Sequence, residues 1–129
     1  MTRQAISTTS APAAVGPYSQ GIALDGLVFC SGQIGLDPAS GVLVDGGVEA
    51  QAERALQNLS AVLDAAGCTF ADVVKTTVFL AEIDDFAAVN AVYARFMPDP
   101  PPARSTFAVG ALPKGARIEI EAIAAKGRL

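Results

Sequence analysis

Apolar residues recur at the spacing of an amphipathic helix in VEAQAERALQNLSAVLDAAG, residues 48–67. They follow the i, i+3, i+4, i+7 pattern that places side chains on one helix face. The apolar positions are Val48, Ala52, Ala55, Leu56, Leu59, Val62, Leu63 and Ala66. Gly67 comes next and is the residue type expected just after a helix C-terminus. The pattern predicts a helix with one buried stripe that stops at Gly67.

A second helical pattern lies in DDFAAVNAVYARFM, residues 84–97. Its apolar stripe consists of Phe86, Val89, Tyr93, Phe96 and Met97. Asp84 or Asp85 is expected to cap the start of this helix, and Pro98 is expected to end it. Asn90 lies on the same stripe, so we expect one polar side chain on the face that packs against the rest of the protein.

The remaining apolar stretches are short, rich in β-branched and aromatic residues and bounded by turn residues, which is typical of strands. They are expected near Gln4 to Ser7, Gln20 to Leu24, Leu27 to Ser31, Val73 to Leu80, Arg104 to Val109 and Arg117 to Ala124. Asp25-Gly26 predicts a hairpin turn between the second and third strands. Residues 36–47 and 112–115 contain Gly and Pro turn signals and are predicted loops.

The predicted elements follow one another in the order β-β-β-α-β-α-β-β. This order favours an α+β fold with a mixed six-stranded sheet and both helices packed on one face. A length of 129 residues without a repeat, a linker or a low-complexity tract predicts a single domain over residues 1–129.

Alternation along the last two predicted strands indicates a polar surface, because side chains at i and i+2 share a face. In ARSTFAV, Arg104 shares a face with Thr106. In RIEIEAIA, Glu119 lies opposite the apolar face of Ile118 and Ile120, which belongs under the helices. If the connection ALPKGA folds back as a hairpin, Arg104 and Glu119 lie on one surface of the sheet.

This surface has two interpretations. An antiparallel sheet commonly keeps one face in water, and exposed ion pairs contribute only about 0–1 kcal/mol each. However, Phe29 and Ser31 share one strand face, and Lys75, Thr77 and Phe79 share another, so large apolar groups are mixed with polar ones. Such a mixture suits a subunit interface, where burial would strengthen the attraction of a guanidinium for anions.

Composition argues against several classes of function. The formal net charge is −4 and the basic residues are scattered, so nucleic acid is not an expected partner. The chain has no histidine, and its two cysteines, Cys30 and Cys68, do not form a CxxC pair. The usual zinc, iron and copper ligand sets and the histidine-based catalytic triads cannot be assembled. We therefore expect no metal site.

The chain is also expected to be soluble. No apolar run approaches the roughly 18 residues that a membrane helix requires, so no membrane partner is expected. Pro12, Pro17 and several hydroxyl residues interrupt any signal-peptide core near the N-terminus. A cytoplasmic location is predicted.

Six ordered blocks of the sequence resemble one known family. They are GPYSQG (16–21), FCSGQIGLDPASG (29–41), KTTVFL (75–80), VNAVYARF (89–96), PPARST (101–106) and RIEIEAIA (117–124). From about Ile6 to Ala125 the chain is similar to the RidA family, also called YjgF, of reactive-intermediate imine deaminases. The segment Pro-Ala-Arg-Ser, followed at a fixed interval by Leu112 and then by Ile-Glu-Ile at 118–120, is a specific signature of this resemblance.

The resemblance implies a chorismate-mutase-like fold that assembles as a homotrimer with three clefts between subunits. It also implies hydrolysis of 2-imino and 2-enamino acids, such as 2-aminoacrylate and its imine tautomer, to 2-keto acids and ammonia, without a cofactor. One alternative stays open, a trimeric binding module that holds 2-keto or other small carboxylates for regulation without turnover. Ribonuclease activity, attached to some relatives, is not expected from an acidic chain without histidine.

The resemblance also assigns roles to single residues. Arg104 matches the arginine that binds the substrate carboxylate, a task that suits a planar guanidinium with two parallel hydrogen bonds. Glu119 matches the glutamate that orients or activates the attacking water and could relay a proton to departing ammonia. Tyr18 matches a tyrosine that covers the substrate from the neighbouring subunit, although an interface tyrosine without chemistry is the alternative.

Four further residues are assigned to the substrate pocket by the resemblance. Ser31 and Gly32 match a loop that lines it, and Asn90 matches a polar helix residue nearby. Thr106 stands where many relatives carry cysteine, so contact with substrate is expected there without thiol chemistry. Structural roles stay open for Ser31, as a small residue at a strand end, and for Asn90, as a buried amide. The proline-rich loop MPDPPP is expected to form one cleft wall, and the substrate side-chain preference is left open.

Overall fold

The first predicted helix is present, and its apolar stripe faces the sheet. In a computed structural model that describes residues 2–126, α1 spans Gly47–Ala65, and Leu56, Leu59 and Leu63 are fully buried. Gly67 adopts a φ of 78°, the left-handed conformation that favours glycine after a helix. The predicted stop is therefore confirmed. The ends of the predicted 1–129 domain, residue 1 and residues 127–129, lie outside the described residues.

The second helix, α2, spans Phe86–Phe96 and begins where expected, but its capping differs from the prediction. Asp85 occupies the N-cap position without a capping hydrogen bond from its side chain. Its carboxylate instead accepts hydrogen bonds from the guanidinium of Arg117, with 2.7 Å between Arg117 Nη2 and Asp85 Oδ1. Asp85 is therefore the N-cap residue, as predicted, but its side chain does not cap the helix, because this charge-assisted pair takes the carboxylate away from the helix backbone.

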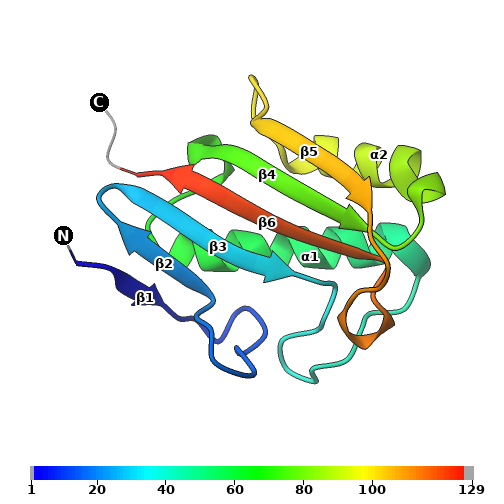
Figure 1. Ribbon diagram of the computed structural model, residues 1–129, viewed down its shortest axis with the longest axis horizontal. Coiled ribbons are helices and arrows are strands. Elements are labelled where there is room, and N and C mark those ends of the chain that lie inside the picture. The colour runs from blue at the N-terminus through cyan, green and yellow to red at the C-terminus, as the bar shows by residue number, and fades with distance from the viewer. Residues whose placement is uncertain (1, 127–129) are drawn as a thin grey trace.

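Six strands form one mixed sheet in the spatial order β1-β2-β3-β6-β4-β5, and both helices lie on one side of it (Figure 1). The strands are β1 (Gln4–Ile6), β2 (Gly21–Leu24), β3 (Leu27–Gln33), β4 (Val73–Leu80), β5 (Ala103–Ala108) and β6 (Ile118–Ala125). All neighbouring strands are antiparallel except β4 and β5, which are parallel. The predicted α+β class is confirmed.

The hairpin expected between the last two strands is not formed. β4 lies between β5 and β6 and pairs with both. In these registers Arg104 is beside Thr76, which is fully buried under the helices, whereas Glu119 is beside Phe79 on the other face. The prediction that Arg104 and Glu119 share one sheet face is therefore wrong. The alternation within each strand was correct, but the polar face of β5 turns toward α2.

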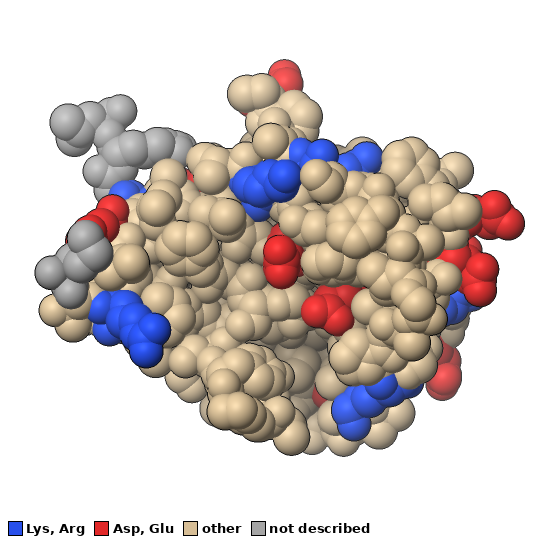
Figure 2. Space-filling model, viewed as in Figure 1, with Lys and Arg blue, Asp and Glu red and all other residues tan. Residues whose placement is uncertain are grey.

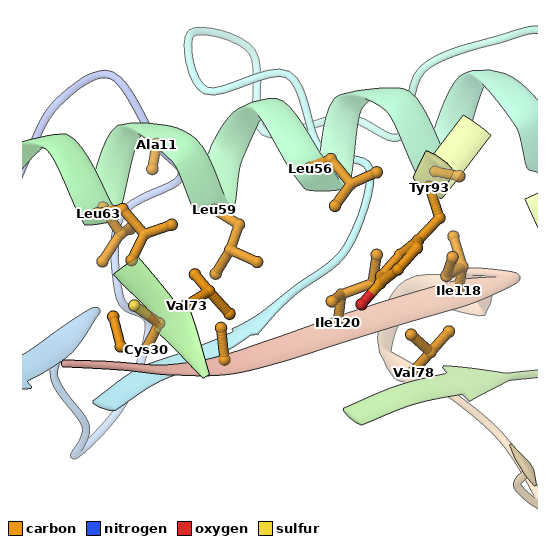
Figure 3. Close-up of a cluster of buried hydrophobic side chains, with 14 of the residues drawn as sticks. Ala11, Cys30, Leu56, Leu59, Leu63, Val73, Val78, Tyr93, Ile118 and Ile120 are labelled. Carbon is orange, nitrogen blue, oxygen red and sulfur yellow. The ribbon is translucent and has the colours of Figure 1, made fainter. Parts of the chain in front are cut away.

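The core fills the space between α1, α2 and the sheet (Figure 3). Ile118 and Ile120 of β6 are fully buried there, as the alternation predicted. Cys30 and Cys68 are both buried. Burial, and secondarily the neighbouring Cys68, raises the pKa of the Cys30 thiol to about 12. Cys30 is therefore a protonated core residue at neutral pH, in agreement with its predicted place on the buried strand face.

The face of the sheet opposite the helices is largely uncovered in the single chain. Leu27, Phe29 and Phe107 are 39–45% exposed on it. The rings of Phe79 and Phe107 meet edge to face, with 5.3 Å between their centroids. Figure 2 views the molecule from this side and shows a mainly uncharged surface with a few acidic and basic groups. Apolar groups of this size on one face indicate a contact surface.

Candidate functional site

Arg104 projects from the edge strand β5 toward helix α2. Its Nη1 donates a hydrogen bond to Asn90 Oδ1 at 2.8 Å. The guanidinium carbon lies 4.8 Å from the ring centroid of Tyr93 and 5.6 Å from that of Phe86. Within residues 2–126, the bond to Asn90 is the one hydrogen bond of this guanidinium, which leaves Nε and Nη2 without a protein acceptor. Two adjacent N–H donors match the two oxygens of a carboxylate.

A hollow of about 570 Å³ opens beside this guanidinium; we call it the arginine hollow. Its lining includes Arg104, Asn90 and Tyr93 together with Met97, Pro98 and Pro101. The proline-rich segment after α2 therefore forms one wall beside Arg104, as expected. Asp99 also lines the hollow, and the apolar walls together with the guanidinium of Arg104 fit a small organic acid.

Thr106 lies two residues beyond Arg104 on the same face of β5. Its Oγ1 is buried and has no hydrogen-bond partner among the described residues. A buried hydroxyl without a partner is uncommon in folded proteins. Its place next to Arg104 makes it a candidate for contact with a bound molecule.

Glu119 lies on the opposite face of the sheet and is half-buried. Removal of its carboxylate from water raises its pKa above the usual range, and the nearby negative charge of Glu121 raises it further. Gly32 lies directly against this carboxylate, because a Cβ on Gly32 would overlap Glu119 Oε2. The missing side chain at Gly32 is therefore what leaves room for the acidic group.

A second hollow, of about 560 Å³, adjoins this carboxylate; we call it the glutamate hollow. Glu119, Gly32, Ser31 and Tyr18 all line it. The structure thus brings together four of the residues that the sequence predicted for the site. Arg104, Asn90 and Thr106 form the other group, on the far side of the sheet.

Ser31 has a structural partner inside this group. Its hydroxyl donates to the backbone carbonyl of Ser19 at 2.6 Å, and its amide donates to the carbonyl of Gln20. The contact joins β3 to the segment that carries Tyr18. Tyr18 is 54% exposed, and its hydroxyl accepts a long hydrogen bond of 3.4 Å from the amide of Val15. Its ring is therefore free to contact another molecule.

Two buried amides hold the loops around the glutamate hollow, and the sequence reasoning missed both. Gln20 accepts from the amide of Thr8 and donates to the carbonyls of Thr8 and Pro12, which fixes the N-terminal segment. Asn58 on α1 donates to the carbonyls of Ile34 and Leu36. Asn58, like Gln51, is a polar residue on the buried side of α1, and its place beside the apolar stripe was the signal that could have identified it.

The two hollows offer carboxylate, hydroxyl, amide, amine and guanidinium groups to a bound molecule. Among the described residues, no three Cys, His, Asp or Glu side chains lie close enough together to bind a metal ion. Neither helix in the described part of the chain is long and apolar enough to cross a membrane.

Comparisons with known proteins extend this description. Residues 8–126 match the family model described as Endoribonuclease L-PSP. Over 129 residues the chain is 55% identical to the 2-iminobutanoate/2-iminopropanoate deaminase of Capra hircus, covering 100% of this chain and 94% of that protein.

Two solved structures have the same fold. RidA from the Antarctic bacterium Psychrobacter superposes with a TM-score of 0.91 at 45% identity, covering 95% of this chain and 98% of that one. Escherichia coli TdcF with bound serine superposes with a TM-score of 0.90 at 42% identity, covering 96% and 99%. At these identities the match concerns the sequence as well as the fold.

Proposed function

This chain belongs to the Endoribonuclease L-PSP family, which includes the RidA deaminases that it resembles, and from this premise we propose that it hydrolyses 2-imino and 2-enamino acids to 2-keto acids and ammonia. Its similarity over the whole length to a 2-iminobutanoate/2-iminopropanoate deaminase supports this reaction. The observation that carries the proposal is the guanidinium of Arg104, held by Asn90 with two nitrogen atoms still available. The reaction takes place in the cytoplasm and needs neither a nucleic acid nor a membrane.

The two groups of site residues act together only between subunits. Arg104 and Glu119 face away from each other in one chain, so the substrate contacts Arg104 of one protomer and Glu119 of the next. Two different surfaces then meet head to tail, and such contacts close into rings. A homotrimer with three equivalent clefts is the assembly that we propose. The exposed apolar face of the sheet lies inside the contact.

Substrate binding begins with its carboxylate. Nε and Nη2 of Arg104 donate two parallel hydrogen bonds to the carboxylate oxygens, while Nη1 stays on Asn90. The hydroxyl of Thr106 donates to the same molecule from the adjacent position. Tyr18 of the neighbouring protomer covers the bound acid. The imine carbon is then fixed relative to the glutamate hollow, and this orientation lowers the barrier for attack by water.

Glu119 handles the protons of the reaction. Its carboxylate accepts a proton from water as the water oxygen adds to the carbon of the protonated C=N bond, which gives a neutral carbinolamine. The acid then returns this proton to nitrogen. As the C–N bond breaks, the carbinolamine hydroxyl gives its proton to the same carboxylate, ammonia and the 2-keto acid leave, and Glu119 releases the last proton to ammonia or solvent. A pKa raised by burial and by Glu121 makes the carboxylate a stronger base and its acid form more available near neutral pH.

A binding module without turnover is the second candidate. The serine bound to Escherichia coli TdcF, a relative with the same fold, supports recognition of small amino or keto acids. Arg104 and Thr106 would suffice for such binding, whereas the raised pKa of Glu119 favours chemistry. Calorimetry with 2-ketobutyrate combined with a deaminase assay separates the two candidates: binding with no acceleration of imine loss supports the module.

The deaminase assay generates the imine in place with an amino-acid oxidase and follows its disappearance. Wild type is expected to accelerate imine loss, and Arg104→Ala to lower kcat/KM by at least about a hundredfold, because a charged carboxylate loses its partner. Arg95→Ala is the matched control, since Arg95 is exposed and, among residues 2–126, forms an ion pair only with Glu53. Imine loss at the same rate with and without wild-type protein would contradict the proposal.

A further inference from the structure

The guanidinium of Arg104 lies against a single face of helix α2. Phe86, Asn90 and Tyr93 are spaced i, i+4 and i+7, so they project from one side of the helix. The Arg104 guanidinium carbon is 4.8 Å from the ring centroid of Tyr93 and 5.6 Å from that of Phe86. Both distances are within the range of cation–π attraction. We call Phe86, Asn90 and Tyr93 the arginine cradle.

Tyr93 is the fixed member of the cradle. It is only 6% exposed, and its hydroxyl lies 2.6 Å from Thr76 Oγ1. Thr76 is fully buried on β4, directly beside Arg104 in the parallel pair. Figure 3 shows the Tyr93 side chain reaching from α2 toward the sheet. Movement of the ring away from Thr76 would break the hydrogen bond between two buried hydroxyls, so this bond holds the ring in place. Phe86, in contrast, is 40% exposed.

Ring contact and hydrogen bond restrict different movements of the guanidinium. The face of Tyr93 limits how far the charged group can tilt or move away from α2, because the attraction depends on its position over the ring. The bond to Asn90 limits rotation about the guanidinium axis, because it holds Nη1. Together they leave the edge with Nε and Nη2 pointing in one direction. A donor pair that is already oriented binds its acceptor at a lower entropic cost.

We propose that Tyr93, held by Thr76, is a positioning residue that orients Arg104 toward the carboxylate of the substrate, and that Phe86 covers the same guanidinium from the solvent side. This inference rests on the proposed function, because it concerns the residue that binds the carboxylate there. Tyr93 itself acts through Arg104. The simpler role for a buried tyrosine, packing between helix and sheet, predicts a loss of stability without a selective loss of substrate affinity.

Two substitutions of Tyr93 separate the effect of its ring from the effect of its hydroxyl. Tyr93→Leu removes the ring face and is expected to raise KM by about tenfold, the effect of losing a partly buried cation–π contact, while kcat changes less than about twofold. Tyr93→Phe keeps the ring and loses the bond to Thr76, so its KM is expected to rise only about two- to threefold. Phe86→Leu tests the exposed ring in the same assay and is expected to give a KM between those of Tyr93→Phe and Tyr93→Leu.

Phe96→Leu is the matched control. Phe96 lies on the same helix, but its ring packs against Phe70, with 6.1 Å between centroids, and the cation–π contacts of Arg104 within residues 2–126 are with Phe86 and Tyr93. This variant should lower the melting temperature and leave KM unchanged. An increase in KM as large as that of Tyr93→Leu would show that loosening of α2, and not the ring over Arg104, causes the effect. A folded Tyr93→Leu with wild-type KM would also overturn the inference.

Measurement of ligand affinity tests the positioning role of Tyr93 even if the protein shows no catalysis. The Kd for 2-ketobutyrate, measured by calorimetry, should rise about tenfold in Tyr93→Leu and stay unchanged in Phe96→Leu. If wild type binds this acid but does not deaminate, the proposed reaction is contradicted. The positioning role of Tyr93 is then still tested by the Kd values of Tyr93→Leu and Phe96→Leu. If Tyr93→Leu does not fold, Tyr93→Phe and Phe86→Leu carry the test, and wild-type Kd in both would contradict the role. No binding by wild type would overturn both proposals.

Discussion

The surroundings of the Glu119 carboxylate explain the proton transfer that we propose for it. Gly32 presents no side chain there, so the group lies against backbone and loses part of its water. Glu121, two residues along the same strand face, adds a second negative charge. No cation of the described residues forms an ion pair with Glu119 to offset these effects. The carboxylate is therefore held in a state that favours accepting a proton.

Glu119→Gln should abolish deamination and stabilise the fold at neutral pH. Because the pKa is raised in the folded chain, the folded state binds this proton more tightly than the unfolded state, and ionised Glu119 lowers stability above its folded pKa. The melting temperature of the variant should exceed that of wild type at pH 7. The difference should disappear as the pH falls toward about 4, where the glutamate is protonated in both states.

Glu82→Gln is a suitable control for this measurement, because Glu82 is exposed and its carboxylate makes no ion pair among the described residues. Its melting temperature should follow that of wild type over the same pH range. A Glu119→Gln variant that is less stable than wild type at pH 7 would show that the carboxylate is stabilised by its surroundings and that its pKa is not raised.

Thr106→Val should affect stability and binding in opposite directions. The Oγ1 of Thr106 is buried without a partner, so its replacement by a methyl group is expected to raise the free energy of unfolding by about 1 kcal/mol. If the hydroxyl binds the substrate, KM should rise about fivefold or more in the same variant. Chemical denaturation and imine hydrolysis measure the two effects. Unchanged KM would remove Thr106 from the site.

Helix α2 carries more of the candidate site than the sequence indicated. The pattern predicted the helix and placed Asn90 on its packed face. Residue spacing alone did not reveal that Arg104 would meet that face, because the alternation of β5 does not say which side turns toward the helices. That side depends on β5 pairing in parallel with β4, a contact between segments joined through α2.

Local sequence patterns predicted the helices and strands correctly, but they did not predict which strands pair with each other. The stripe of α1, the Asp25-Gly26 hairpin and the alternation of Ile118 and Ile120 all depend on residues close in sequence, and all are confirmed. The expected β5–β6 hairpin failed because strand order depends on long-range pairing, which a short connection does not determine.

Asn58→Ala should weaken the loop that forms part of the glutamate hollow. Asn58 is fully buried and bonds the carbonyls of Ile34 and Leu36 while accepting from Arg54. Loss of the amide leaves buried carbonyls without donors and should cost about 3 kcal/mol of unfolding free energy. Denaturant unfolding measures this loss, and Gln57→Ala, at an exposed position of α1, should stay within about 0.5 kcal/mol of wild type. Equal stability of the two variants would contradict the role of Asn58.

The proposed assembly would connect the two halves of the proposed site. One face of the sheet carries Glu119 among exposed aromatic side chains, and the other carries Arg104 beside the arginine hollow. The strand of Arg104, β5, forms one edge of the sheet (Figure 1). A contact between the first surface of one protomer and the second surface of the next is a head-to-tail contact. Both surfaces of every protomer are then occupied only if the ring closes. The uncovered apolar face and the separated site residues thus have one common explanation.

Mixed trimers test this central claim most directly. Arg104→Ala and Glu119→Ala chains carry different affinity tags, are co-expressed and are purified through both tags, so every assembly contains both variants. Each variant alone is expected to be inactive. A mixed ring of three has one cleft with an intact Arg104 from one chain and an intact Glu119 from the next, so about one third of the wild-type deaminase rate should return. Mixed assemblies as inactive as either variant alone would contradict a site shared between protomers.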